Sequence, residues 1–177
     1  MAGPELGQLV PALNADGFLT RLVPAGEEIP GEQLFVLLGD VEDFTLSLEL
    51  MLLPEISEPT VLQLFVALPF EATEHTSPDL ARFLLALNNA LALTGFGMDE
   101  SNGWVFYRHL VVCADNQPLD SELLLNTVWM VDYQLDRFAP LIGDVAAGKA
   151  DLAQGLASLE INLKSWQPNE GEEDLAV

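Results

Sequence analysis

Two stretches near the middle of the chain contain residue types that bind phosphates or calcium. Gly95-Phe96-Gly97 begins like a dinucleotide-binding fingerprint, but Glu100 stands where the third glycine belongs, and an expected helix precedes it instead of a strand. Asp99 to Gly103 has the residue types of a calcium loop, but Trp104 occupies the sixth position, where an EF-hand needs glycine. Both stretches therefore favour a helix end that leads into a polar hairpin turn.

Histidine and cysteine are too rare and too far apart to indicate a catalytic or metal site. The chain has two histidines, His75 and His109, and one cysteine, Cys113. On a strand, the Cα atoms of His109 and Cys113 lie ~13 Å apart, too far to share one zinc ion. No nucleophile-elbow motif is present, and a nucleophile needs a base within reach. We therefore predict no catalytic residue, no metal site and no cofactor.

The 28 acidic residues leave one enzymatic alternative open. Paired carboxylates can act as general acid and base when their environments separate their pKa values. So many acids also produce many accidental pairs, most of them on a solvated surface. The alternative to a binding protein is thus a small carboxylate-dependent hydrolase or lyase with an acidic cleft.

The last long helix has apolar residues outside its core stripe. Its expected core stripe consists of Leu124, Val128, Val131, Leu135, Phe138 and Ile142. Leu125 and Trp129 lie roughly 100–140° around the helix from this stripe, and Tyr133 continues their line. Tryptophan and tyrosine are enriched in protein interfaces, so Leu125, Trp129 and Tyr133 are predicted to form one. The alternative is that a loop or the N-terminal helix covers this side.

Composition restricts the class of partner. The chain has 177 residues and a mass of 19.3 kDa, with 50% hydrophobic residues and only 19% charged ones. The formal net charge is −22, and the six basic residues are scattered, so we expect neither nucleic acid nor a membrane surface as partner. No apolar run approaches the ~18 residues of a transmembrane helix. A single cysteine and an N-terminus without a cationic region favour a cytoplasmic protein.

Hydrophobic periodicity predicts an α+β fold: an antiparallel β-sheet, made of a meander plus a hairpin, packed against helices. Two helices are expected at 5–14 and at 151–159. Another should run from an N-cap at Ser77 to a left-handed C-cap at Gly95, and a long helix should begin after Asp120. The strands are expected at 18–23, 33–38, 44–53, 60–68, 96–98 and 104–112. Gly39-Asp40 should end the second strand, and Pro140 should kink or end the long helix. We assign 1–166 to a single domain and 167–177 to an acidic disordered tail.

At the second helix and the hairpin, the chain resembles the YbjN-like family. The similar residues are 84–89, 95–99 and 103–108, and 119–138 is similar to the family's last helix. The order of elements agrees over about 18–142, whereas the acidic tail and the segment 144–159 are departures. The resemblance implies a fold related to type III secretion chaperones of the CesT kind, which form dimers and hold extended segments of client proteins. It implies no catalytic residue.

The residues and the resemblance together favour a protein-interaction module without enzymatic activity. We expect it to be chaperone-like or regulatory, to bind a client protein segment, and to form a homodimer. Because each subunit carries −22, such a dimer needs an apolar contact well above ~1,000 Å².

Overall fold

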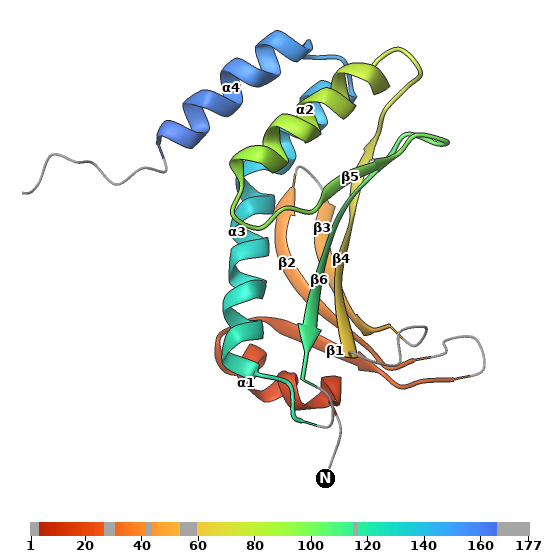
Figure 1. The fold of residues 1–177 in the computed structure, drawn as a ribbon, viewed down its shortest axis with the longest axis vertical. Coiled ribbons are helices and arrows are strands. Elements are labelled where there is room, and N and C mark those ends of the chain that lie inside the picture. Colours follow the sequence, from red (N-terminus) through yellow and green to blue (C-terminus); the bar gives the residue numbers. More distant parts are fainter. Residues whose placement is uncertain (1–3, 27–30, 42–43, 54–59, 115–116, 166–177) are drawn as a thin grey trace, which may run out of the picture.

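The described residues form one antiparallel sheet with helices on one side (Figure 1). The computed structural model describes residues 4–26, 31–41, 44–53, 60–114 and 117–165. The strands are β1 (Leu19–Val23), β2 (Gln33–Val41), β3 (Phe44–Leu52), β4 (Thr60–Glu71), β5 (Phe96–Asp99) and β6 (Trp104–Cys113). Their order is β1-β2-β3-β4-β6-β5, and every neighbouring pair is antiparallel. The α+β class is therefore confirmed, and so is the meander with its added hairpin.

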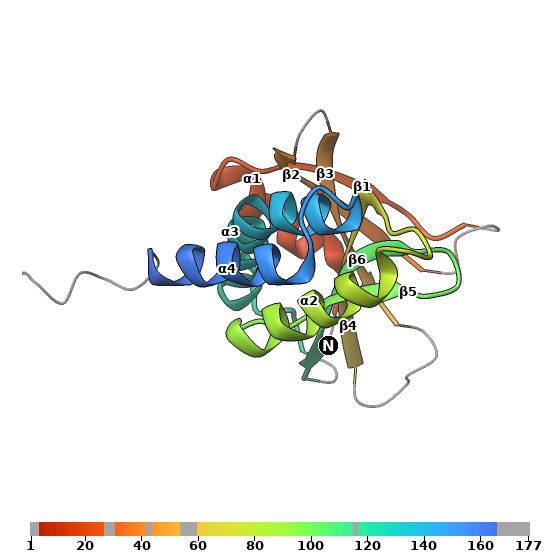
Figure 2. The same cartoon turned by 90° about the horizontal axis from the view of Figure 1, so that it is seen from above.

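The helices pack on one face of this sheet. They are η1 (Leu6–Leu9), α1 (Val10–Ala15), α2 (Ser77–Ala90), α3 (Ser121–Ala146) and α4 (Leu152–Lys164). α3 contacts β2 and β4, and α4 packs against α2 and α3, as the view from above shows (Figure 2). None of the helices in the described ranges is long and apolar enough to span a bilayer. The assigned tail, 167–177, lies outside the described residues.

The core follows from alternation in the strands and from one stripe on each long helix. Leu48, Leu50, Leu64 and Val66 point toward the helices and are buried. The expected stripe of α3 is buried throughout: Leu124, Val128, Val131, Leu135, Phe138 and Ile142. The start of α3 is also as expected, because the Asp120 side chain accepts a hydrogen bond from Leu123 N at 3.0 Å.

One expected interruption does not occur, and the other does not end its helix. β2 continues through Gly39-Asp40 to Val41, with a register shift between Leu37 and Asp40. Gly39 N donates to Asp132 Oδ1 of α3 at 3.1 Å, so a helix holds the strand at this point. α3 continues past Pro140 to Ala146, so of the two predicted effects of this proline the end of the helix does not occur. Proline removes one helical hydrogen bond, and burial of the surrounding stripe of α3 outweighs that loss.

The glycine after α2 has a different role from the expected one. α2 follows Thr76 at the N-cap position, so its start lies one residue away from the predicted cap at Ser77. It ends at Ala90, and Gly95 is absent from the described glycines with positive φ. A Cβ at Gly95 would lie 2.6 Å from the carbonyl oxygen of Arg108. Close approach of two backbones, not a left-handed cap, therefore requires glycine here.

Asn88 connects the end of α2 to the start of β5. Its Nδ2 donates to the Phe96 carbonyl at 2.7 Å, and its Oδ1 accepts from the backbone nitrogens of Gly95 and Phe96 at 3.1 Å each. The half-buried side chain of Asn88 thus provides hydrogen-bond partners for three backbone groups at the junction between α2 and β5.

We predict that Asn88→Ala lowers the free energy of unfolding by about 2 kcal/mol, because three partly buried backbone groups lose their partner. Asn89→Ala is the matched control, since the neighbouring asparagine is exposed. We expect the control to change stability by less than about 0.5 kcal/mol. Urea denaturation of the two variants measures the difference, and equal losses would contradict the role of Asn88.

Candidate functional site

The sheet face opposite the helices is the most extensive candidate site in the described residues. We call it the open face. The strands are curved (Figure 1), and two hollows indent this face, so it is concave. Its apolar side chains are only partly buried. They include Leu19, Phe35, Leu37, Met51, Phe65, Trp104, Phe106 and Leu110.

The register of the sheet places five side chains of the open face in one row. Arg21 pairs with Phe35, Phe35 with Glu49, Glu49 with Phe65, and Phe65 with Arg108. The row crosses β1, β2, β3, β4 and β6 without a break. Its chemistry alternates: cation, aromatic ring, carboxylate, aromatic ring, cation. We call these five residues the central row.

An aromatic cluster lies beside the row on β4 and β6. The ring of Phe65 stacks on Phe106, with centroids 5.8 Å apart and planes at 27°. Trp104 lies 5.8 Å from Phe65 and 6.3 Å from Phe106. Together with Met51 and Glu49, these rings line a hollow of about 540 Å³. Large rings that remain half exposed are the side chains that dominate protein interfaces.

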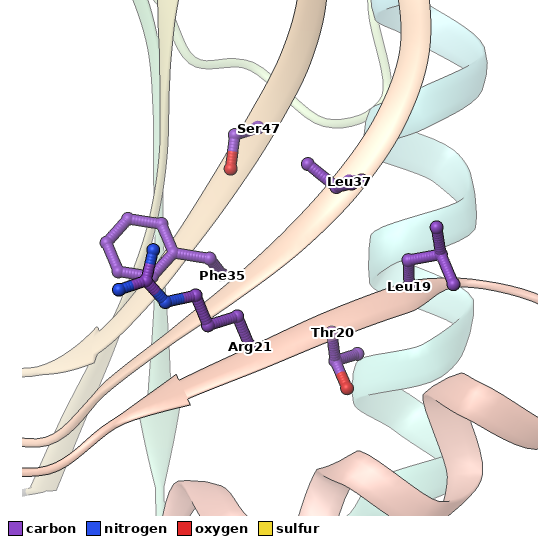
Figure 3. Close-up of a pocket in the computed structure, with 6 residues that line it drawn as sticks. All are labelled: Leu19, Thr20, Arg21, Phe35, Leu37 and Ser47. Atoms are coloured by element: carbon purple, nitrogen blue, oxygen red, sulfur yellow. The ribbon is translucent and has the colours of Figure 1, made fainter.

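A second hollow of about 280 Å³ lies at the β1 end of the open face. Leu19, Leu37 and Ser47 form one side of it, and Arg21 and Phe35 form the other (Figure 3). The guanidinium of Arg21 lies alongside the ring of its cross-strand partner Phe35 in this view. The stem of Arg21 therefore covers part of the aromatic surface while its charge stays in solvent.

Glu49 lies at the centre of the row. Its Oε1 accepts a hydrogen bond from Gln33 Nε2 at 2.6 Å. Partial burial between two phenylalanines raises the pKa of Glu49 above its ordinary value of 4.5. The charged groups that share its row are Arg21 and Arg108, both two strands away.

Asp99 lines the same hollow as Glu49 but does not form a catalytic pair with it. Asp99 pairs with Trp104 on the far edge of the sheet. Three strand spacings and a four-residue offset put its Cα about 20 Å from that of Glu49. Hydrogen bonds from the side chain and backbone of Ser101 lower the pKa of Asp99. Asp99 thus shapes its turn, and this pair gives the hydrolase alternative no support.

The predicted interface residues of α3 lie away from the open face. Trp129 is 45% exposed and Tyr133 39%, whereas Leu125 is half-buried against the core. The ring of Trp129 packs on Phe18 with centroids 4.7 Å apart, and its Nε1 donates to Asp16. The segment after α1 therefore covers one side of Trp129. This agrees in part with the alternative that a loop or the N-terminal helix covers this side of α3.

The remaining candidates from the sequence stay apart. His109 contacts the Thr94 carbonyl at 3.3 Å, and Cys113 is half-buried, with desolvation raising the pKa of its thiol. No group of three or more potential metal-ligating side chains occurs within the described ranges.

Compared with known proteins, the chain matches no family model, no curated protein and no solved structure. Membership of the YbjN-like family therefore stays a prediction.

The central row was not among the sequence-predicted sites. Alternation in 44–53 and 60–68 does indicate a second face on each strand, and Glu49 belongs to it. The row itself depends on which residues of different strands stand opposite each other. The signal that could have suggested it is the aromatic set Phe65, Trp104 and Phe106, all of which share one strand face.

We predict that Glu49→Gln stabilises the protein at pH 7. Because burial raises the pKa of Glu49, the folded state disfavours the ionised carboxylate, so its neutral replacement relieves a penalty. The expected gain is about 1–2 °C in melting temperature. It should shrink as the pH falls through 4.5, where the native carboxyl becomes neutral in both states. Glu74→Gln, on an exposed loop, controls for the general effect of removing one negative charge, and an equal gain in both variants would contradict the prediction.

Proposed function

We propose that this protein is a non-enzymatic protein-interaction module whose open face binds an apolar segment of a client protein. The observation that carries the proposal is the half-exposed aromatic cluster in a concave sheet face. Soluble monomers rarely leave a contiguous apolar surface of this kind in water without using it for binding. A chaperone-like or a regulatory role would both use such a surface, and the resemblance to the YbjN-like family is in line with either.

The chemistry of the face suits recognition better than catalysis. Phenylalanine, tryptophan and arginine line its two hollows, and interfaces draw most of their binding energy from a few residues of this kind. Among the described residues of the face, Glu49 is the carboxylate whose pKa is raised, and it already accepts a hydrogen bond from Gln33. A hydrolase or lyase would need a second group within reach of the same substrate bond.

We further propose that two copies associate through Leu125, Trp129 and Tyr133 on α3. Trp129 and Tyr133 keep large exposed areas even though Phe18 covers one side of the indole. This surface lies away from the open face, so a dimer formed through it leaves both client surfaces accessible. Apolar contact is the favourable term that must overcome repulsion between two subunits of charge −22.

Binding to the open face is tested with a permanently unfolded, reduced and alkylated protein as the probe. We expect Phe65→Thr to weaken binding about tenfold, because it removes the ring at the centre of the aromatic cluster. Phe44→Thr is the matched control: Phe44 is 54% exposed, lies in the same sheet and is not part of the open face. Titrations followed by fluorescence anisotropy give both affinities. Equal weakening by both variants, or none by either, would refute binding at this face.

Association through α3 is tested by light scattering at 0.15 M salt. We expect a mass near twice 19.3 kDa for the wild type and near 19.3 kDa for Trp129→Ala, since the indole is the largest side chain of the proposed contact. Leu123→Ala is the control, because Leu123 is 53% exposed on another side of α3. A monomeric wild type would exclude the dimer, and a dimeric Trp129→Ala variant with an intact fold would exclude this interface.

A further inference from the structure

Among the described residues, Arg21 and Arg108 have no ion-pair or hydrogen-bond partner for their side chains, whereas three other cations do. Lys164 forms an ion pair with Glu160 at 2.6 Å, Lys149 lies 3.7 Å from Asp144, and Arg137 donates to the Asn162 carbonyl at 2.7 Å. Within the described ranges, neither arginine of the central row forms an ion pair or a hydrogen bond through its side chain. The chain has 28 acids and only six cations, so two arginines on one apolar face without an acidic partner among the described residues form an unusual arrangement.

The two arginines mark the ends of a surface with a defined length. Four strand spacings separate β1 from β6 along the row, so their Cα atoms lie about 19 Å apart. Glu49 stands at the midpoint, about 10 Å from each. The charges along the row are therefore positive, negative and positive, with a phenylalanine in each interval. A complementary ligand has the opposite order of charges with apolar groups between them.

A second copy of the chain does not supply this order when two central rows are aligned. A two-fold axis along the row places each residue opposite its own copy. An axis across the row places Arg21 opposite Arg108 and again Glu49 opposite Glu49. Both arrangements bring only like charges together.

An extended peptide is also a poor occupant of the sheet face. The backbone groups beneath the central row are already used in the ladders between strands. A strand laid over the rings of Phe35 and Phe65 would bury its own N–H and C=O groups without partners. An α-helix satisfies these groups internally, and its convex surface fits a concave face.

We infer that the open face binds an amphipathic helix of a partner protein that presents an acidic, a basic and an acidic residue at successive heptad positions, against Arg21, Glu49 and Arg108. Positions seven apart lie 10.5 Å apart along a helix and on nearly the same side. Leucine-type residues three and four positions after the first charge would contact Phe35, and those three and four positions after the second charge would contact Phe65. This inference rests on the proposed function and specifies the partner of that same site.

The net charge of the chain does not oppose this recognition at physiological salt. Charges farther than ~8 Å from the ligand are largely screened at 0.15 M. The three pairs of the central row act at contact distance and are partly desolvated by the docked helix, so they decide which sequence binds. If the partner helix has zero net charge, the remaining long-range electrostatic repulsion from the chain is also removed.

Two synthetic helical peptides test the inference. Both carry the same leucine stripe and have zero net charge, adjusted on the face away from the stripe. One presents glutamate, lysine and glutamate at heptad spacing, and the other lysine, glutamate and lysine. We expect the wild-type protein to bind the first peptide about tenfold more tightly than the second at 0.15 M salt, measured by isothermal titration calorimetry.

Variants then assign the preference to the row. The double variant Arg21→Glu/Arg108→Glu should reverse the order of the two peptides, and Arg82→Glu, which makes the same change on exposed α2, should leave it unchanged. Arg21→Gln and Arg108→Gln should each weaken the first peptide about threefold, which keeps the test available if the double variant does not fold. Circular dichroism of each variant controls for folding.

The outcomes separate this inference from the proposed function. If both peptides bind equally, and Phe65→Thr weakens both, the open face is a docking surface but the charge order is wrong. If neither peptide binds, although the unfolded probe does so in a manner sensitive to Phe65→Thr, a helical occupant is excluded while the proposed function holds. If no probe responds to Phe65→Thr, both proposals fail.

Discussion

The register of β4 is the constraint on which both faces of the sheet depend. β4 pairs with β3 on one side and β6 on the other, and its alternate residues divide sharply: Leu64 and Val66 enter the core, whereas Phe65 stays on the open face. A shift of one residue would bury Phe65 under α3 and expose the two aliphatic side chains. It would also remove Phe65 from its place between Glu49 and Arg108. The core and the candidate site are thus two consequences of one pairing.

Local signals in the sequence were sufficient wherever one element decides its own structure. Alternation located the strands, and Asp120 located the start of α3. The failures occur where tertiary contacts override a local preference. β2 continues through Gly39-Asp40 where Asp132 of α3 accepts a hydrogen bond from Gly39, and Gly95 is fixed by the approach of β6 instead of by a helix cap. The central row could not be predicted for the same reason, because it consists of residues from five strands and exists only once their register is set.

The exposed side of α3 is compatible with both alternatives that the sequence left open, a protein interface and cover by another part of the chain. Trp129 was expected outside the core stripe, and its exposure agrees with that expectation. The Trp129 indole nevertheless packs on Phe18 and donates a hydrogen bond to Asp16, both in the segment that follows α1. A tryptophan fixed in this way loses little conformational freedom when a partner covers its exposed half, which lowers the entropic cost of association. Intramolecular cover and an interface role are therefore compatible at this position.

The charge of the chain and the charge order of the open face act at different ranges. A net charge of −22 keeps copies of the chain apart and discourages indiscriminate contact through exposed apolar surface. That field does not distinguish one apolar segment from another, because it depends on total charge and is screened within ~8 Å at 0.15 M salt. Discrimination requires fixed charges at contact distance, and the rigid spacing of strands supplies it by holding Arg21 and Arg108 on either side of Glu49. A helix whose charges do not match this order would bury Glu49 without a positively charged partner and would place no acid against either arginine, and each mismatch costs binding energy. In such an arrangement the aromatic rings provide affinity for apolar segments in general, and the three charges of the row select among them.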